Sequence, residues 1–109
     1  MTNQLDTVFA ALSDPTRRAV LDRLIDGPAP VGDLHAPHPM ALPTFLRHLK
    51  VLEKAGLVRT QKTGRVRTVH IEAEPMAAAE TWLHRHRTLW NARLDRLDAL
   101  MQQTKGPKP

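Results

Sequence analysis

One segment of the chain reads Ala41-Leu-Pro-Thr-Phe-Leu-Arg-His-Leu-Lys-Val-Leu-Glu-Lys-Ala-Gly-Leu57. Apolar residues recur in it with the i, i+3, i+4, i+7 spacing of an amphipathic helix, at Leu42, Phe45, Leu46, Leu49 and Leu52. Pro43 suits the first helical turn, and Gly56 suits the position just beyond a helix end. The opposite face carries cations and hydrogen-bonding groups, at Thr44, Arg47, His48, Lys50 and Lys54. Ordinary solvated helices have such a face too, so the neighbouring segments must decide its role.

Basic residues are concentrated in this segment and directly after it. Residues 47–70 hold seven Lys or Arg and one Glu, a net charge of +6, whereas residues 1–46 carry −2 and residues 71–109 carry +1. A basic block confined to one supersecondary unit is the electrostatic footprint expected for a nucleic-acid partner. The 109 residues suffice for one domain with a modest core, which dimerisation would enlarge.

The composition excludes several kinds of site. The chain has no cysteine, and therefore no disulfide, no thiolate metal ligand and no thiol redox switch. It lacks the basic start and apolar run of a signal peptide, and no segment approaches the ~18 apolar residues of a membrane span. We therefore expect a cytoplasmic protein with no membrane partner.

Three helices are predicted before residue 41. The first covers residues 3–12 and has apolar residues at helical spacing, namely Leu5, Val8, Phe9 and Leu12. Asp14 can cap the second helix and Pro15 can take its first position, and this helix is expected to end at Gly27-Pro28. Its apolar residues are Ala19, Val20, Leu21, Leu24 and Ile25. A brief helix is predicted over residues 31–36.

A basic hairpin is predicted after residue 56. Two β-rich runs, residues 57–62 and 67–72, flank a turn with glycine at Thr63-Gly64-Arg65-Val66. One face would pack on the helices, and the tip would present Lys62, Arg65 and Arg67. A short helix, a tight connection, a longer basic helix and a hairpin constitute a winged helix-turn-helix. The predicted fold is therefore mainly α with a small β-hairpin, in the order α-α-α-α-β-β-α.

Pro75 opens a long last helix that is expected to end near residue 103. Its apolar stripe is broad and consists of Trp82, Leu83, Leu89, Trp90, Leu94, Leu97, Leu100 and Met101. Because a small domain cannot cover so wide a stripe, pairing with a second copy is favoured over packing on its own domain. Residues 1–104 are expected to form a single DNA-binding and dimerisation domain, and residues 105–109 a frayed tail.

Four segments also follow one another in a familiar order. They are Val8-Phe-Ala-Ala-Leu-Ser-Asp-Pro-Thr-Arg-Arg18, Arg47-His-Leu-Lys-Val-Leu-Glu-Lys-Ala-Gly-Leu-Val58, the pair Gly64-Arg65, and the stretch from Trp82 to Leu97. Together they resemble the ArsR/SmtB family of bacterial winged-helix repressors, particularly the branch without the cysteine metal box. Ala41 and Leu46 depart from the family's pattern, because many members carry serine at these positions.

The resemblance implies a homodimer, paired through its first and last helices, that binds an imperfect palindrome near its own promoter and represses transcription. It also implies that Thr44, Arg47 and His48 face the major groove, and that Arg65 reaches the adjacent minor groove or the DNA backbone. For Arg17, a structural salt bridge and a contact with the DNA backbone both stay open.

The predicted site is thus an interface with double-stranded DNA plus a dimer interface. The predicted DNA-binding residues are Pro43, Thr44, Arg47, His48, Lys50, Lys54, Lys62, Arg65 and Arg67. The predicted dimerisation residues are Leu5, Phe9, Trp82, Leu83, Leu89, Trp90, Leu94, Leu97 and Met101. Among the first set, Arg47 suits a guanine edge, whereas the lysines and Arg67 suit phosphates.

Other kinds of site find little support. Glu80 and His84 are spaced i, i+4 and a dimer would double them, but no ligand set of the family is complete, so no metal or cofactor is predicted. His35 and His38 are expected to be exposed in a Pro-rich turn, and His70 on a strand surface. The chain offers no catalytic constellation, so that an enzyme is not expected. Two alternatives stay open: a metal- or small-molecule-responsive sensor on the same fold, and a winged-helix protein-interaction module with weak DNA affinity.

Overall fold

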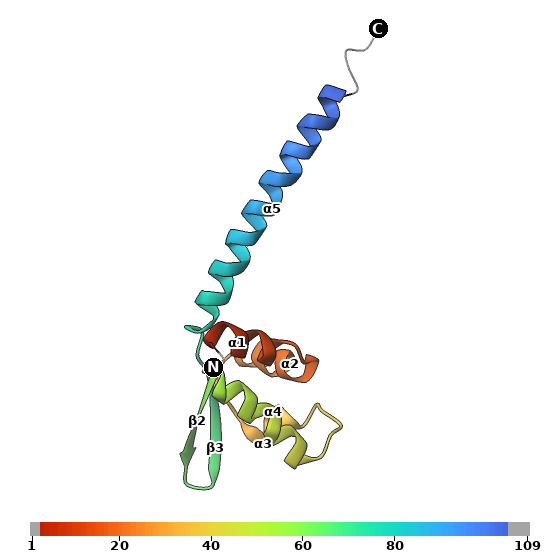
Figure 1. Ribbon diagram of the computed structural model, residues 1–109. Helices are drawn as coiled ribbons and strands as arrows, with labels where there is room; N and C mark the ends of the chain where they lie inside the picture. The colour runs from red at the N-terminus through yellow and green to blue at the C-terminus, as the bar shows by residue number, and fades with distance from the viewer. Residues whose placement is uncertain (1–2, 105–109) are drawn as a thin grey trace. The chain divides into compact units, whose positions relative to one another are not determined.

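The computed structural model describes residues 3–104 of the chain (Figure 1). Its elements are α1 (Gln4–Leu12), α2 (Pro15–Leu24), β1 (Ala29–Pro30), α3 (Val31–His35), α4 (Leu42–Lys54), β2 (Val58–Thr63), β3 (Val66–Ile71) and α5 (Met76–Thr104). The mainly α fold with a small antiparallel sheet agrees with the sequence prediction. Contacts divide the chain into two compact units, with the boundary between Ala79 and Glu80 inside α5. The predicted tail, residues 105–109, lies outside the described residues.

Side-chain caps begin the first two helices. The side chain of Asn3 accepts a hydrogen bond from the backbone N–H of Asp6 at 2.9 Å. Asp14 likewise accepts from the backbone N–H of Arg17 at 3.1 Å, and Pro15 follows it at the start of α2. Each cap satisfies a backbone donor that the helix itself leaves unpaired, which is worth about 1 kcal/mol. The predicted roles of Asp14 and Pro15 are confirmed.

The end of α2 differs from the prediction. The helix stops at Leu24, and Ile25 is 73% exposed instead of belonging to the buried face. The backbone tightens here, since Ile25, Asp26 and Gly27 each donate to the carbonyl three residues before. Such tighter turns change the angular step between side chains, and Ile25 consequently leaves the apolar face.

Helix α4 ends as the sequence predicts. Gly56 has φ +74°, its N–H donates to the carbonyl of Glu53, and the N–H of Leu57 donates to that of Leu52. These two hydrogen bonds form a Schellman motif, and the apolar contact that usually accompanies it is available because Leu52 and Leu57 are fully buried. The predicted apolar face was too long at the other end: Leu42 is 45% exposed, because it is the first residue of the helix and lies a turn before buried Phe45.

The sheet has three strands in the order β1-β3-β2, all antiparallel. Thr63 pairs with Val66, so the turn is the pair Gly64-Arg65 rather than the four residues predicted. Gly64 has φ +63° and Arg65 has a negative φ, as in a type II′ hairpin turn. Strand β1 was not predicted, because two residues show no alternation. Pro30 is tolerated there because β1 is an edge strand.

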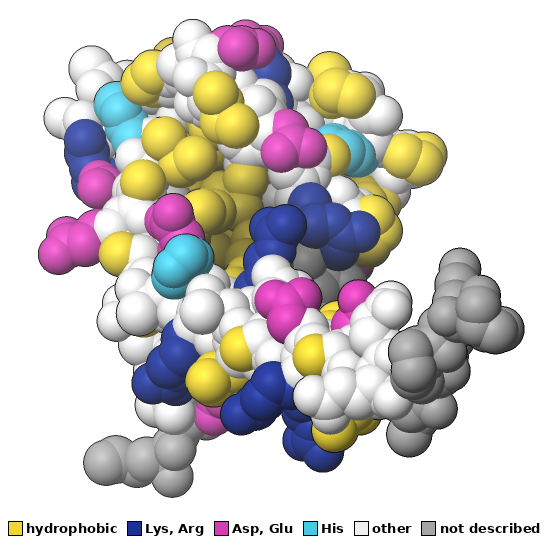
Figure 2. Space-filling view, turned by 90° about the horizontal axis from the view of Figure 1, so that it is seen from above, with side chains coloured by type: hydrophobic (Ala, Val, Ile, Leu, Met, Phe, Trp, Pro, Cys, Tyr) yellow, Lys and Arg dark blue, Asp and Glu magenta, His cyan; other side chains and the backbone are white. Residues whose placement is uncertain are grey.

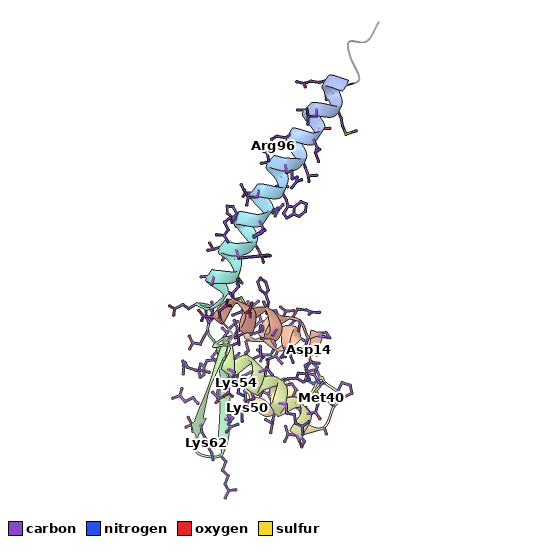
Figure 3. All side chains as sticks on the ribbon, viewed as in Figure 1. Asp14, Met40, Lys50, Lys54, Lys62 and Arg96 are labelled. Carbon is purple, nitrogen blue, oxygen red and sulfur yellow. The ribbon has the colours of Figure 1, made fainter. Side chains whose placement is uncertain are left out.

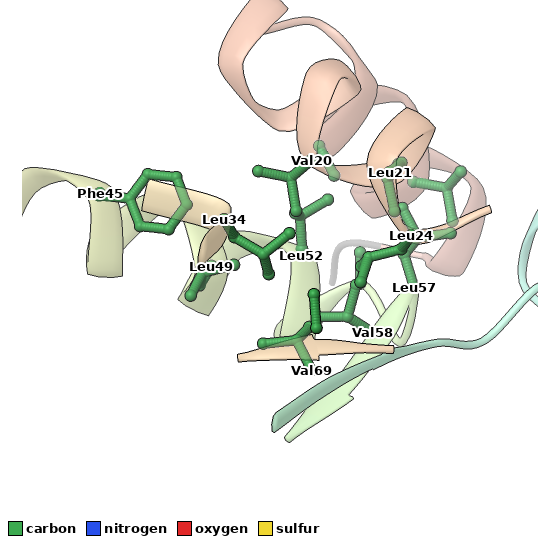
Figure 4. Packing of buried hydrophobic residues seen from close by; sticks show 14 of the residues in the cluster. Val20, Leu21, Leu24, Leu34, Phe45, Leu49, Leu52, Leu57, Val58 and Val69 are labelled. Atoms are coloured by element: carbon green, nitrogen blue, oxygen red, sulfur yellow. The ribbon is translucent and has the colours of Figure 1, made fainter. Parts of the chain in front are cut away.

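The core of residues 3–79 lies between the helices and the sheet, and Figure 4 shows side chains from α2, α4 and the strands gathered in it. Its largest fully buried side chains are Phe45, Leu24, Leu34, Leu49, Leu52, Leu57, Val8, Val20 and Val69. Within the described part of the chain, no polar or charged side chain is buried. The core therefore fixes which face of α4 remains at the surface. None of the described helices is long and apolar enough to cross a membrane.

Candidate nucleic-acid interface

The face of α4 that points away from the core carries most of the predicted DNA-binding residues. Pro43, Thr44, Arg47, Lys50 and Lys54 are all exposed. From Thr44 onward they recur every three or four residues, and so they follow one side of the helix. The buried side chains on the other face hold this row in a fixed orientation relative to the sheet. Figure 3 shows Lys50 and Lys54 on α4, with Lys62 on the neighbouring hairpin.

The tip of the hairpin adds the remaining predicted cations. Lys62, Arg65 and Arg67 are exposed, and Lys62 lies directly opposite Arg67 in the strand register. Like charges at opposite positions of two strands repel each other, and an anion between them would relieve the repulsion. Among residues 3–104, the ion pair that involves the hairpin joins Arg59 Nε to Glu72 Oε1 at 2.7 Å, and it lies away from the tip. The tip is therefore suited to an anionic partner.

A groove connects the helix to the hairpin. It has a volume of about 270 Å³ and is lined by Leu46, Leu49, Lys50, Glu53 and Arg67. Lys50 from α4 and Arg67 from β3 thus reach the same groove, although they are far apart in the sequence. Glu53 adds one carboxylate to the same wall. The helix and the wing consequently form one continuous surface of mainly positive charge.

His48 is placed differently from the other predicted contacts, because its side chain is only 19% exposed. Its Nδ1 lies 3.0 Å from Nη1 of Arg17 and 3.7 Å from Oδ2 of Asp14. The other two guanidinium nitrogens of Arg17 donate to backbone carbonyls at the end of α1: Nε to Ala11 at 2.8 Å and Nη2 to Ala10 at 3.0 Å. Arg17 thus has a structural role, made of hydrogen bonds rather than the salt bridge considered from the sequence.

Asp14 sits at the centre of this cluster. Partial burial opposes ionisation of its carboxyl group, but the hydrogen bond from the Arg17 backbone N–H and the positive charges of His48, when protonated, and of Arg17 outweigh it. The pKa of Asp14 is therefore lower than its ordinary value of 3.8. The carboxylate at the start of α2 stays charged at neutral pH and keeps capping the helix.

The two histidines of the Pro-rich turn were wrongly predicted to be simply exposed. His35 and His38 are half-buried, and their rings lie against Phe45 with centroid distances of 5.1 and 5.6 Å. His35 Nε2 also donates to the backbone carbonyl of Met40 at 2.7 Å, which ties α3 to the residues before α4. The turn folds back over Phe45, and this shelters both rings. The sequence signal for this contact is only that an aromatic residue begins the buried face of α4. His70 on β3 is half-buried as well.

The predicted dimerisation residues fall into two groups. Leu5 and Phe9 are half-buried and pack against the core of residues 3–79. Trp82, in α5, is half-buried and stacks on His86 at a centroid distance of 4.0 Å. Seven large apolar side chains further along α5 are at least 50% exposed; they are the predicted Leu83, Leu89, Trp90, Leu94, Leu97 and Met101, together with Leu100. In the space-filling view, hydrophobic side chains lie among Lys and Arg side chains on the surface (Figure 2).

The metal pair considered from the sequence lies on α5, and both of its members, Glu80 and His84, are exposed. Among the described residues no group of three or more His, Asp or Glu side chains could hold a metal ion.

The fold and the basic surface of α4 and the hairpin define a protein of the winged helix-turn-helix class.

Comparison with known proteins narrows this class. Residues 12–61 match the model of a helix-turn-helix domain family. The HTH-type transcriptional regulator Rv2034 of Mycobacterium tuberculosis is 40% identical over 80 residues, which are 73% of this chain and 75% of the relative. The transcriptional repressor SdpR of Bacillus subtilis is 35% identical over 60 residues, 55% of this chain and 67% of the relative.

Solved structures give the same result. The crystal structure of the ArsR family transcriptional regulator RHA00566 has a TM-score of 0.77 and 54% identity, and covers 82% of this chain and 98% of its own. The solution structure of the homodimeric winged helix-turn-helix DNA-binding domain Mb0332 of Mycobacterium bovis has a TM-score of 0.62 and 25% identity, over 85% and 83% of the two chains. This chain belongs to the ArsR family of helix-turn-helix transcriptional regulators. That family consists of DNA-binding regulators and is not a family of enzymes.

Proposed function

We propose that this protein is a homodimeric repressor that acts in the cytoplasm and binds a palindromic operator near its own promoter. The observation that carries the proposal is the continuous basic surface formed by α4 and the hairpin, since residues 47–70 have a net charge of +6. One relative is named a repressor, and one similar structure is described as homodimeric. This chain is similar to both of these regulators, and this supports the proposal.

The side chains of the interface divide into two roles. Thr44 and Arg47 lie in the first half of α4, the part of a recognition helix that contacts base edges. The guanidinium of Arg47 can donate two hydrogen bonds to a guanine, which discriminates against other bases by about 1–3 kcal/mol. The remaining exposed cations hold phosphates, which fix the position of the protein but carry no sequence information. They are Lys50, Lys54, Lys62 and Arg67. Arg65, in the turn of the hairpin, reaches the adjacent minor groove or the DNA backbone.

The dimer explains why the operator is palindromic. The apolar stripe of α5 pairs with the same stripe of a second copy, and Leu5 and Phe9 add to the contact. Two copies related by a two-fold axis present two α4 helices, and the two half-sites that they read must then be related by the same symmetry. The single domain expected from the sequence, residues 1–104, is thus proposed to hold both interfaces. No metal, cofactor or small-molecule ligand is part of the proposal.

Fluorescence anisotropy tests the proposal. The labelled DNA is the region upstream of the protein's own gene, with a scrambled sequence of the same composition as the control, each at low and at physiological salt. We expect salt-dependent binding to both at low salt, and binding that survives at physiological salt only on the native sequence. Equal, salt-labile binding to both would contradict a specific repressor at this promoter and would favour the protein-interaction module.

A further inference from the structure

The contact between Arg17 and His48 determines where the imidazole carries its proton. A guanidinium has only donors, so the atom that faces Nη1 of Arg17 at 3.0 Å must accept a hydrogen bond. That atom is Nδ1 of His48, which must therefore be unprotonated. A neutral imidazole with an unprotonated Nδ1 carries its proton on Nε2. In this arrangement His48 is a hydrogen-bond donor at Nε2, on the side of the ring away from the Arg17 contact.

Asp14 does not impose the opposite tautomer. Its Oδ2 lies 3.7 Å from Nδ1 of His48, beyond hydrogen-bond distance, and the same oxygen accepts from the backbone N–H of Arg17 at 3.1 Å. The Arg17 side chain is closer and is the better placed partner. Arg17 therefore fixes the tautomer, and Asp14 holds the backbone of Arg17 at the start of α2.

Arg17 is itself held firmly. Its Nε and Nη2 donate to the carbonyls of Ala11 and Ala10, in the last turn of α1, where the helix dipole favours a cation. With two of its nitrogens anchored in this way, the third cannot turn away from His48 without breaking both bonds. The end of α1, the start of α2 and the middle of α4 are thereby joined through one side chain.

We propose that Arg17 is a positioning residue that holds His48 as the Nε2–H tautomer, so that His48 donates a hydrogen bond to an acceptor on the operator. The inference rests on the proposed DNA-binding function. His48 follows Thr44 by one helical turn and adjoins Arg47 in the sequence, so that it borders the exposed row of α4. The acceptor is a phosphate oxygen, or a purine N7 or guanine O6, since all three accept and none donates.

A double-mutant cycle tests whether Arg17 acts through His48. The variants are Arg17→Met, which keeps the length of the side chain but removes its donors, His48→Leu, and the two combined. We expect each single change to weaken operator binding about tenfold, and the double variant to bind no more weakly than His48→Leu alone. Multiplied losses in the double variant would overturn the inference, because Arg17 would then contact DNA or stabilise the fold independently of His48.

Two matched variants separate the charge of Arg17 from its geometry. Arg18 is the neighbouring cation, and its Nη1 donates to the carbonyl of Leu12 at 2.8 Å. We expect Arg18→Met to lose much less affinity than Arg17→Met; an equal loss would contradict the positioning role. His48→Gln places an amide donor near the position of Nε2, and we expect it to retain most of the affinity that His48→Leu loses. Circular dichroism confirms at the assay temperature that each variant is folded.

Nitrogen-15 NMR of the free protein at pH 8 reports the tautomer directly. We expect Nε2 of His48 to be protonated and Nδ1 unprotonated in the natural chain, and the two nitrogen shifts to move toward each other in Arg17→Met. A proton on Nδ1 in the natural chain would overturn the inference.

The anisotropy assay also identifies the acceptor: equal losses on operator and scrambled DNA indicate a phosphate, and losses on the operator alone indicate a base. If the natural chain fails to discriminate the two DNAs, the proposed function fails; if it discriminates but the cycle shows multiplied losses, only this inference fails.

Discussion

At the scale of single residues, Asp14 links helix stability to pH. Its folded-state pKa is lower than the ordinary value of 3.8, so the stabilisation by its carboxylate is complete above that value and is lost as the pH falls through the lower folded one. We expect Asp14→Ala to lower the free energy of unfolding by about 1 kcal/mol at pH 7 through loss of the cap. Urea denaturation followed by circular dichroism, from pH 7 down to below the folded pKa, should show this difference shrinking.

The matched control for that series is Asp14→Asn, which keeps a capping oxygen but no titrating group. Its stability at pH 7 should lie closer to the natural chain than that of the alanine variant. A difference between Asp14→Ala and the natural chain that stays constant over the whole pH range would contradict the role of the ionised carboxylate.

Variants of Arg47 and Lys62 should separate the recognition of bases from the binding of phosphates. Arg47→Ala is expected to weaken operator binding by about 1–3 kcal/mol, with a smaller effect on scrambled DNA, because it removes donors to a base edge. Lys62→Ala is expected to weaken both DNAs about equally and to lower the salt slope by about 1, because one phosphate contact is lost. Anisotropy titrations over a range of salt concentrations measure both. The division would be wrong if the two variants lost the same affinity on both DNAs.

The sequence predicts the site only where its residues belong to a single helix, because the helical repeat then determines which side chains are exposed. The exposure of Thr44, Arg47 and Lys50 follows from the spacing of the apolar residues on the other side of α4. The contact between Arg17 and His48 joins residues 31 positions apart, and no local pattern encodes such a distance. The actual base and phosphate contacts stay predictions, because the residues of the protein alone do not define the path of the DNA.

At the scale of elements, the helix boundaries that depend on hydrogen bonds between residues close in sequence were predicted well. The Asp14 cap and the Gly56 terminus fix their helices through side-chain or backbone hydrogen bonds between near neighbours. The features that were missed depend on partners distant in sequence, such as β1, which is a strand only because Ala29 and Pro30 pair with β3. Short elements of this kind are specified by tertiary structure rather than by their own residues.

Gly56 allows a test of one such terminus. Its φ of +74° costs an L residue about 1–2 kcal/mol, and an added Cβ would lie 3.3 Å from Cγ of Pro75. We therefore expect Gly56→Ala to destabilise the protein by about that amount in urea denaturation. The control is Gly32→Ala in α3, where no positive φ is required and a Cβ meets nothing within 4 Å. Equal effects of the two changes would contradict the strain at Gly56.

At the scale of the whole molecule, the long helix α5 carries a series of exposed apolar side chains. Seven large hydrophobic side chains of α5 are at least 50% exposed, and all of them except Leu100 are among the predicted dimerisation residues. Exposed apolar surface on this scale marks an interaction site, and a second copy of the same stripe is a partner of matching chemistry. The sequence predicted this stripe because its spacing is helical, but spacing alone does not name the partner.

Trp90 is the residue at which the dimer is most directly tested. Its side chain is 63% exposed on α5, so a change there removes few contacts within the chain. We expect Trp90→Glu to yield monomers of 12.3 kDa, since a carboxylate placed in an apolar interface would lose its hydration without gaining a partner. Asn91→Glu adds the same charge to the next position of the helix, off the predicted stripe, and should leave the dimer intact. Sedimentation velocity at micromolar concentration distinguishes these results. An unchanged sedimentation coefficient for Trp90→Glu would show that the dimer does not depend on this part of α5. The dimer interface would then have to lie elsewhere on the chain.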